Sequence, residues 1–477
     1  MVASPCWLVK GPVIGFSLLR RGQIETVVGC GQQFCHVLAF TYKKHSQQSR
    51  TKTHHGGLCK ARLKDVRRAC NCEYAVSRTM ACAVLPVACF FEAADVWLFP
   101  FSLIARAMEP ADVEKTLLSL PCLKSGGALC VTNCTDTEWH QMYVVDDGHM
   151  KVVVSIPSWT GLELRSKILA SECLGQTVGP RHLATLEGEG GRRLLVNEFL
   201  EGGTLNVPDL TAKVLRDVGQ LYAQLHRTDT SWFDPVREEL ARSGDLHIEG
   251  CDWTFCLWVL PRLQCLVPEA NREELHSRGV DWAFLAREIQ ELPTNTALPS
   301  GTAVSSRKAC VHGDAHLGNI MWHEDRLRLI DFDMTAPGPA GADLAYLVLM
   351  LFRCGFSRDA VADLNAQKEF ARGYLTGLGE LDEGPRLEEQ LEEFLFEMHR
   401  WAYVGMIQMG LLCAVLMHNE GHPQKRELMQ LRGPVLLHPS FLSKAKEIIQ
   451  EAILDTSLRA EVLEQGLFFV TEARWTP

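Results

Sequence analysis

The sequence lacks the cysteine spacings that mark a disulfide framework or a structural zinc site. Its 477 residues include 18 cysteines, but they form no paired C-x-x-C knuckles, and those beyond residue 90 are scattered without regular spacing. The sequence therefore predicts neither a small fold held together by disulfide bonds nor a zinc ribbon. We expect reduced thiols in an intracellular, cytoplasmic compartment.

Long uninterrupted apolar runs are also missing. The best candidate, residues 80–107, is interrupted by Pro86, Glu92, Asp95 and Pro100. A membrane-spanning helix needs about 20 consecutive, predominantly apolar residues. We therefore expect no transmembrane segment.

Acidic residues are scarce in the first 107 positions, which hold 14 Lys and Arg against 5 Asp and Glu, whereas the remainder holds 34 against 53. Residues 1–107 therefore form a basic, cysteine-rich N-terminal extension. We expect that this extension directs the protein to an organelle or is poorly ordered. The remainder, with a net charge of -19, argues against nucleic acid as a partner. The sequence gives no indication of the oligomeric state.

Hydrophobic patterning divides the rest of the chain into two parts. Residues 108–203 are expected to form a β-rich lobe, with helices at 111–120 and 164–175 and strands at 139–145, 151–156 and 194–199. Residues 204–477 are mostly helix-compatible, beginning with apolar positions at helical spacing between 210 and 225. The predicted fold class is α+β, with a small β-rich lobe and a large, mainly helical lobe.

The most informative segment reads VHGDAHLGN at 311–319 and is followed by LIDFD at 329–333. The spacing from His312 through Asp314 to Asn319 matches the H-x-D-x-x-x-x-N pattern of kinase catalytic loops. Phosphoryl transfer needs a carboxylate that orients the attacking hydroxyl and oxygen ligands for Mg²⁺ on the phosphates. The sequence therefore predicts Asp314 as catalytic base and Asn319 and Asp331 as metal ligands. A hairpin over 320–330 would return Asp331 to Asn319.

This segment resembles the aminoglycoside phosphotransferase and choline/ethanolamine kinase superfamily, whose loop reads H-G-D-x-x-x-x-N. The resemblance spans about residues 108–420. It implies a two-lobed, protein-kinase-like fold, a small-molecule alcohol or amino-alcohol as acceptor, and ATP with Mg²⁺ as cofactors. It also implies that the backbone near Glu198, Phe199 and Leu200 forms the hinge that holds adenine.

Three further side chains near the loop receive supporting roles. The resemblance implies that the His312 ring bonds the backbone close to the metal-binding acid. Asp343, within GADLA at 341–345, is expected to be a buried anchor of the loop. For Asp333 three roles stay open: a second metal ligand, a substrate-side residue, and a polar neighbour, which we favour.

The nucleotide side departs from the superfamily pattern. Kinases of this fold use a cation on a small-lobe strand to hold the phosphates, but the strand KVVVSIP places Ser155 at the phosphate-facing position. Arg165 or Lys167, on the next helix, could supply the cation. Asn133 is a predicted nucleotide contact. More residues separate it from the Gly-Gly pair at 126–127 than is usual in this superfamily. A pseudokinase acting as a binding module therefore stays an alternative.

The signal for the acceptor lies near residues 396–408. Choline and ethanolamine kinases carry a run ending W-x-x-W-x-I-I-Q, and alignment places Trp401 on the first aromatic but Val404 on the second. Because an aromatic face attracts a quaternary ammonium, choline or ethanolamine is the first expectation, with Trp401 as a substrate contact. The alternative is that Trp401 and Tyr403 divide between core and solvent. Aminoglycoside, sugar or homoserine-like acceptors and a protein Ser/Thr kinase also remain open.

Overall fold

The computed structural model describes residues 15–20, 23–28, 108–120, 123, 129–136, 140–243, 253–300, 303–348, 364–381, 384–418 and 423–476. The chain divides into two compact units, Met1–Trp97 and Leu98–Pro477. In the first unit, strands β1 (Gly15–Arg20) and β2 (Gln23–Val28) pair as an antiparallel hairpin. The expectations for residues 1–107 otherwise lie outside the described residues. No described helix is long and apolar enough to cross a membrane.

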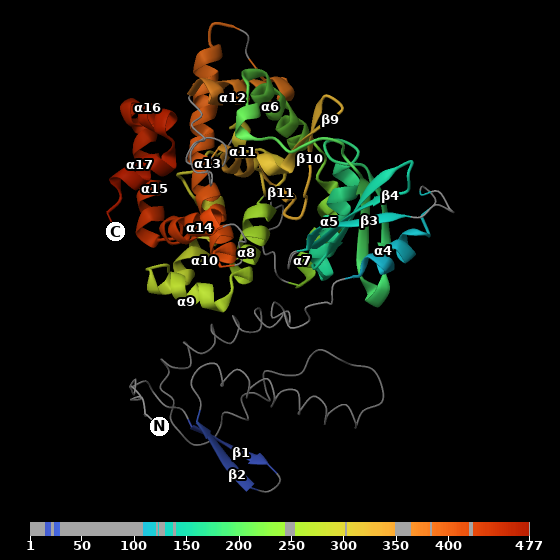
Figure 1. Cartoon of the computed structure of the whole chain (residues 1–477). Helices are drawn as coiled ribbons and strands as arrows, with labels where there is room; N and C mark the ends of the chain where they lie inside the picture. Colours follow the sequence, from blue (N-terminus) through green and yellow to red (C-terminus); the bar gives the residue numbers. More distant parts are fainter. Residues whose placement is uncertain are drawn as a thin grey trace. The chain divides into compact units, whose positions relative to one another are not determined.

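The second unit begins with the small lobe, whose centre is a five-stranded antiparallel sheet (Figure 1). Its strand order is β3-β4-β5-β7-β6. The strands are β3 (Cys130–Asp136), β4 (His140–Asp146), β5 (Lys151–Pro157), β6 (His182–Glu187) and β7 (Arg193–Glu198), and the helices are α4 (Pro110–Leu117) and α5 (Gly161–Leu174). The predicted β-rich lobe is confirmed, including the hairpin of β4 and β5.

The turn between β4 and β5 shows why this hairpin forms at these residues. Gly148 has φ +81°, a left-handed conformation that glycine adopts without strain. The side chain of Asp146 accepts a hydrogen bond from the Gly148 N–H at 2.8 Å, and Asp147 accepts one from the Met150 N–H at 2.6 Å. These local bonds reverse the chain and fix the strand register.

Strand β5 has two different faces. Val152, Val154 and Ile156 are buried in the hydrophobic core that the sheet shares with α4. Because side chains alternate along a strand, Ser155 points to the opposite face of the sheet. That residue is 7% exposed, so it is buried against protein on this second face.

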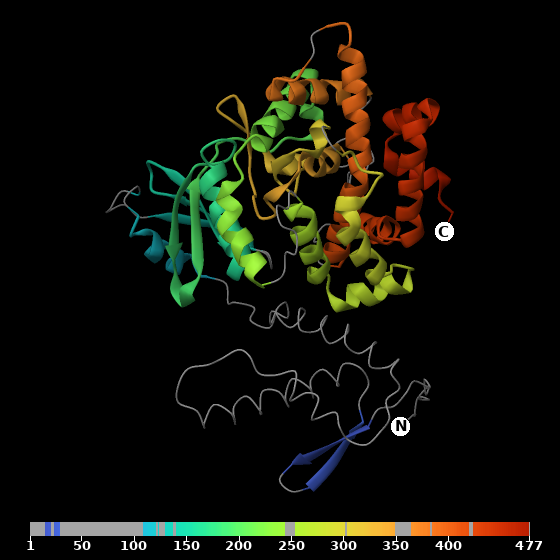
Figure 2. The same cartoon turned by 180° about the vertical axis from the view of Figure 1, so that it is seen from behind.

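The large lobe is built from helices, and its core surrounds the long helix α13 (Figure 2). The helices are α6 (Ala212–His226), α7 (Asp234–Ser243), α8 (Leu260–Leu266), α9 (Glu269–Ser277), α10 (Trp282–Glu291), α11 (Ala340–Val348), α12 (Leu364–Leu378), α13 (Leu387–Leu416), α14 (Pro423–Leu436), α15 (Pro439–Leu454), α16 (Thr456–Gln465) and α17 (Leu467–Arg474). Helix α6 packs on α12, and α11 packs on α13. The predicted α+β architecture, with a small β-rich lobe and a large, mainly helical lobe, is confirmed.

Short strands between α10 and α11 carry the loop segments of the large lobe. They form two antiparallel pairs: β8 (Lys308–Val311) with β11 (Ala336–Pro339), and β9 (Ile320–His323) with β10 (Arg326–Leu329). The second pair is the hairpin predicted from the sequence, and its turn residues Glu324 and Asp325 have φ of +47° and +62°.

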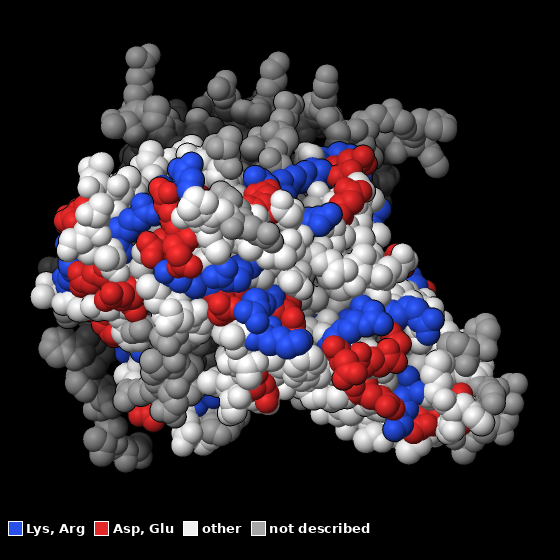
Figure 3. All heavy atoms as spheres, turned by 90° about the horizontal axis from the view of Figure 1, so that it is seen from above, with Lys and Arg blue, Asp and Glu red and all other residues white. Residues whose placement is uncertain are grey.

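Charged side chains of both signs alternate over the molecular face seen in Figure 3. That face therefore offers no broad area of positive charge of the kind that binds nucleic acid.

Candidate active site

The predicted catalytic loop runs from the end of β8 to a helical turn at Leu317–Asn319. After the β9–β10 hairpin, the Ile330 N–H donates to the Asn319 carbonyl at 3.0 Å. This bond places Asp331, the next residue, beside Asn319. The sequence prediction that the hairpin returns the second acid to the loop is therefore confirmed.

Asp314 is held by the amide of Asn319. The Asn319 Nδ2 donates to the Asp314 carboxylate at 3.1 Å and to the Asp314 carbonyl at 3.0 Å. The His316 Nε2 lies 3.4 Å from the same carboxylate. Desolvation opposes ionisation of Asp314, but the hydrogen bond and charge of His316, helped by His312 and Asn319, outweigh it and lower the pKa of this carboxyl. The group therefore stays ionised and accepts hydrogen bonds.

Gly313 precedes the base and leaves no room for a side chain. Its φ is +80°. An added Cβ would lie 2.7 Å from the Phe255 ring and closer still to the Met334 carbonyl. Glycine in the H-G-D motif is thus required by local packing.

A buried carboxylate anchors the backbone of the loop. Asp343, in the first turn of α11, accepts hydrogen bonds from the N–H groups of His312 and Gly313 at 2.6 and 2.8 Å. It also meets the ring of His226, whose other nitrogen bonds Tyr374. The predicted anchor role of Asp343 is confirmed.

The ring of His312 ties the loop to the segment that carries the second acid. Its Nε2 lies 2.9 Å from the Ile330 carbonyl, and its Nδ1 accepts from the Asp314 N–H at 3.2 Å. Burial lowers the pKa of His312 below the ordinary histidine value, although Asp343 and Asp314 oppose the shift. The structural role expected for this ring is confirmed.

Gln408 is a further loop anchor to which the sequence assigned no role. Its side chain on α13 is fully buried, and the Nε2 donates to the Gly313 carbonyl. Its position in the aromatic run of 396–408 was the only available signal.

Asp331 occupies a strained and electrostatically unfavourable position. Its φ is +64°, which is uncommon for a residue with a side chain. Desolvation, and then the negative charges of Asp333 and Asp314, raise the pKa of Asp331 well above the ordinary value. The residue itself remains exposed, so the desolvation comes from surrounding protein and not from loss of all water contact. A cation bound here would offset the clustered negative charge.

Asp333 has both oxygens engaged by the small lobe. Its Oδ2 accepts from the Trp159 Nε1 at 3.0 Å, and its Oδ1 forms an ion pair with Lys167 of α5. Desolvation would raise the pKa of Asp333, but the Lys167 charge and hydrogen bond lower it strongly. Asp333 therefore connects the two lobes in this structure.

The two candidate cations of α5 point in different directions. Arg165 is exposed and bonds Glu239 of α7 at 3.0 Å, whereas Lys167 is buried and pairs with Asp333. Ser155, across the sheet, supplies no charge. Lys167 is thus the α5 cation that reaches the acidic segment.

A second contact joins α5 to the large lobe. Arg262 of α8 stacks 4.4 Å from the Trp159 ring centroid and lies 3.4 Å from the Glu163 carboxylate. Burial lowers the pKa of Arg262 to about 10, and Glu163 and Asp333 oppose that shift. Sequence reasoning missed this contact, because the stretch from about 230 to 305 gives mixed signals for secondary structure.

The predicted hinge begins at Glu198, the last residue of β7. The Phe199 N–H bonds the Lys151 carbonyl at 3.4 Å, and the Glu198 carboxylate accepts from the Arg181 N–H at 3.2 Å. The Leu200 N–H takes part in none of the backbone hydrogen bonds found among the described residues. It is therefore available as a donor for a planar nitrogen base.

The other predicted nucleotide contact, Asn133, is exposed on β3, opposite Tyr143. The Gly-Gly pair at 126–127 lies outside the described residues. Among the described residues, no hydrogen bond or ion pair connects Asn133 with the catalytic loop, so its role stays a prediction.

The aromatic residues expected near the acceptor are in the core. Trp401 and Tyr403 are both fully buried, as is Val404. The Trp401 Nε1 donates to the Ser305 hydroxyl at 3.1 Å, and the Tyr403 hydroxyl donates to Glu288. The alternative in which one of the two rings faces water was wrong.

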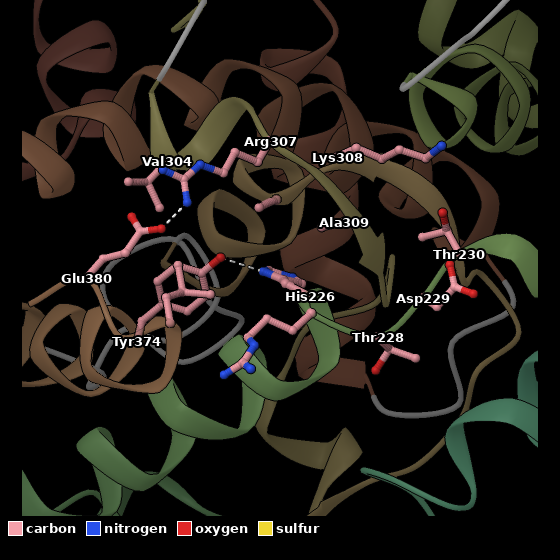
Figure 4. A pocket seen from close by; sticks show the side chains of 13 residues that line it. His226, Thr228, Asp229, Thr230, Val304, Arg307, Lys308, Ala309, Tyr374 and Glu380 are labelled. Atoms are coloured by element: carbon pink, nitrogen blue, oxygen red, sulfur yellow. Dashed lines mark hydrogen bonds and ion pairs between the residues drawn. The ribbon is translucent and has the colours of Figure 1, made fainter.

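A pocket of about 470 Å³ lies on the side of the loop anchor, and it contains none of the predicted catalytic residues. Figure 4 shows His226, which binds Asp343, beside Tyr374 at one wall, and Arg307 with Glu380 at another. This pocket does not contain the residues of the active site.

The chemistry of the donor set fits Mg²⁺ on a nucleotide. The described residues contain no cluster of three His, Cys, Asp or Glu side chains that could hold a metal alone. Mg²⁺ is commonly held by one or two carboxylates together with substrate phosphates. Asn319 and Asp331 are oxygen donors on adjoining segments, which suits such a site.

Comparison with known families decides the class of enzyme. Residues 164–401 match the model of a family described as the phosphotransferase enzyme family. This stretch of the chain belongs to that family. The match includes Asp314, Asn319 and Asp331, and the protein is a phosphotransferase that acts on an alcohol group of a small molecule.

Solved structures similar to this phosphotransferase include two kinases and one protein of a kinase family. An ethanolamine kinase from Plasmodium vivax is 17% identical over 66% of this chain and 83% of its own, with a TM-score of 0.49. A choline kinase from Cryptosporidium parvum is 14% identical over 72% and 95%, with a TM-score of 0.48. A choline/ethanolamine kinase family protein from Mesorhizobium loti is 14% identical over 75% and 99%, with a TM-score of 0.40. No curated protein matches the phosphotransferase in sequence.

Proposed function

We propose that this phosphotransferase moves the γ-phosphate of ATP to a hydroxyl group of a small amino-alcohol, with Mg²⁺ on the nucleotide. The observation that carries the proposal is the assembly of Asp314, Asn319 and Asp331 at one place by the β8 loop and the β9–β10 hairpin. Phosphoryl transfer asks the protein mainly to position groups and neutralise charge. These residues are suited to both tasks.

Asp314 is the proposed base. Its ionised carboxylate, held by Asn319 and His316, would accept the proton of the acceptor hydroxyl and orient its oxygen toward the phosphate. The Asn319 Nδ2 is used in this contact, so its Oδ1 is the atom available to a metal. Asp331 would supply the second oxygen. Bound Mg²⁺ would neutralise the phosphate oxygens.

The backbone at Glu198, Phe199 and Leu200 is the proposed adenine site. The Leu200 N–H is not used in the described backbone hydrogen bonds, and a hinge donor and acceptor pair suits the edge of an adenine ring. Asn133 and Ser155 remain proposed contacts on the nucleotide side.

Choline or ethanolamine is the first proposed acceptor. The excess of 53 acidic over 34 basic residues beyond position 107 supports a cationic acceptor. Trp401 gives this choice no support as an exposed aromatic face, because the ring is buried. Sugars and aminoglycosides are therefore included in the test.

The test is an ADP-release assay on the purified full chain with Mg²⁺ and ATP. The panel contains amino-alcohols, sugars, aminoglycosides and a generic protein substrate, and Asp314→Asn serves as the blank. We expect ADP release with an amino-alcohol that disappears in the variant. Chain that binds nucleotide but turns over no acceptor would indicate a pseudokinase, and label on the protein substrate would indicate a protein kinase.

A further inference from the structure

The phosphate-facing position of strand β5 carries no cation. Kinases of this fold pair a strand lysine with a glutamate on the following helix, and the lysine holds the α- and β-phosphates. Here Ser155 occupies the strand position. The strand's own lysine, Lys151, lies at its start, 3.7 Å from Asp146 and 5.9 Å from the Phe199 ring centroid. Lys151 is therefore engaged at the hinge end of the strand.

Helix α5 carries a lysine on its buried face. Lys167 is 7% exposed and shares that face with Ala170, Ser171 and Leu174. Residues two apart on a helix are separated by about 200°, so Arg165 faces solvent, where it bonds Glu239. A buried ammonium needs a charged or polar partner.

The partner of Lys167 is Asp333, two residues after the proposed metal ligand Asp331. Trp159 fixes the other oxygen of Asp333 at 3.0 Å. An ammonium group has three hydrogen-bond donors. The ion pair with Asp333 uses only some of the donors of Lys167. The donors of Lys167 that Asp333 leaves unused would be available to phosphates on a metal held by Asp331, two residues before Asp333.

This pairing differs from the usual arrangement, in which the strand carries the lysine and the helix its carboxylate. Here the helix carries the lysine, and the segment after the hairpin carries its carboxylate. We infer that Lys167, held in place by Asp333, is the residue that contacts the nucleotide phosphates in this protein. This inference rests on the proposed function, because it requires that the chain binds Mg²⁺ and a nucleotide.

The experiment measures Mg²⁺–ADP binding by titration calorimetry, so it does not depend on the acceptor. Lys167→Gln removes the charge but keeps a donor for Asp333. A hydrogen bond to a charged group contributes about 1.5–3 kcal/mol, so we expect ADP affinity to fall about 10- to 150-fold. Lys167→Arg should retain most of the affinity. Arg165→Gln, on the exposed face of the same helix, should bind as wild type.

A rescue variant separates phosphate contact from a merely structural role. Ser155→Lys with Lys167→Gln returns a cation to the strand, and ADP affinity should recover at least tenfold relative to Lys167→Gln alone. Circular dichroism and thermal unfolding of each variant confirm folding, and Ser155→Lys alone shows that the strand accepts the lysine.

Three outcomes would overturn the inference. Wild type that binds no Mg²⁺–ADP would overturn the proposed function and this inference with it. Wild type that binds, with a folded Lys167→Gln that binds equally well, would overturn the inference alone. A folded double variant without recovery would assign Lys167 to the support of Asp333 only.

Discussion

Asn319 donates its side-chain amide to the carboxylate of Asp314 at 3.1 Å. This bond joins a proposed metal ligand to the proposed base. The amide nitrogen of Asn319 binds the base, and its amide oxygen remains available to the cation. Asp314 and Asn319 are five positions apart in the sequence. With one helical turn at Leu317–Asn319, a loop of this length brings the two side chains together.

Asp314→Asn should abolish most of the phosphotransfer while leaving the fold intact. The amide keeps an acceptor for Asn319 but cannot take the proton of the acceptor hydroxyl. Loss of a general base typically costs about 10²- to 10⁴-fold in rate, so kcat should fall in that range in a coupled ADP assay, with Mg²⁺–ADP affinity changed less than threefold. Asp325→Asn, in the exposed hairpin turn, is the matched control. A kcat within threefold of wild type would remove Asp314 from the role of base.

Gly313→Ala should destabilise the protein through contact with the neighbouring segments. A left-handed φ costs an alanine about 1–2 kcal/mol, and forcing a methyl group against the Phe255 ring and the Met334 carbonyl adds about 1–3 kcal/mol. Gly148→Ala is a matched control, since Gly148 has φ +81° but nothing within 4 Å of an added Cβ. Urea unfolding should show a larger loss for Gly313→Ala. Equal losses of unfolding free energy in the two variants would mean that the residues around Gly313 can move to accommodate a methyl group.

The catalytic loop could be predicted from the sequence because its contacts are local. His312, Asp314, Asn319 and Asp331 lie within 20 positions, and a two-stranded hairpin joins their segments. Spacing and turn residues therefore contain nearly all the necessary information. The same holds for the β4–β5 hairpin, where Asp146 and Asp147 bond residues two or three positions away.

The contacts between lobes could not be predicted in this way. Whether Arg165 or Lys167 reaches the acidic segment depends on the rotation of α5, which is set by packing against distant elements. Arg262 approaches Trp159 across more than 100 positions, and no periodicity encodes that meeting. Both Trp401 and Tyr403 are buried because α13 is surrounded on every side in its middle turns, whereas an amphipathic helix would expose one of them.

The stability contribution of His312 should depend on pH. Burial lowers its pKa in the folded protein, while in the unfolded chain it titrates near the ordinary value of about 6.5. The contribution of the neutral ring is therefore complete above that value and decreases as the pH falls below it. At pH 7.5, His312→Gln should lose about 1–3 kcal/mol of unfolding free energy, the cost of disturbing buried hydrogen bonds.

The measurement for His312 is urea unfolding of wild type and His312→Gln at pH 7.5, 6.0 and 5.0. The difference between them should narrow as the pH falls, by at most about 1.4 kcal/mol per pH unit. His418→Gln is the control, because His418 is an exposed histidine that bonds Glu274 at 2.8 Å on the surface. A difference that stays constant over this range would show that His312 titrates normally in the folded state.

Substitution of Trp401 should affect stability before it affects the acceptor. The ring is fully buried, its Nε1 donates to the Ser305 hydroxyl, and it closes over Gly341 of α11. Trp401→Phe keeps an aromatic ring but loses the donor, so unfolding free energy should fall by about 1–3 kcal/mol. The KM for a quaternary amine such as choline should change less than twofold, since a ring without an exposed face offers no cation–π contact. A choline KM raised tenfold, with the KM for ATP unchanged, would instead show that the α13 face opens to the acceptor during the reaction.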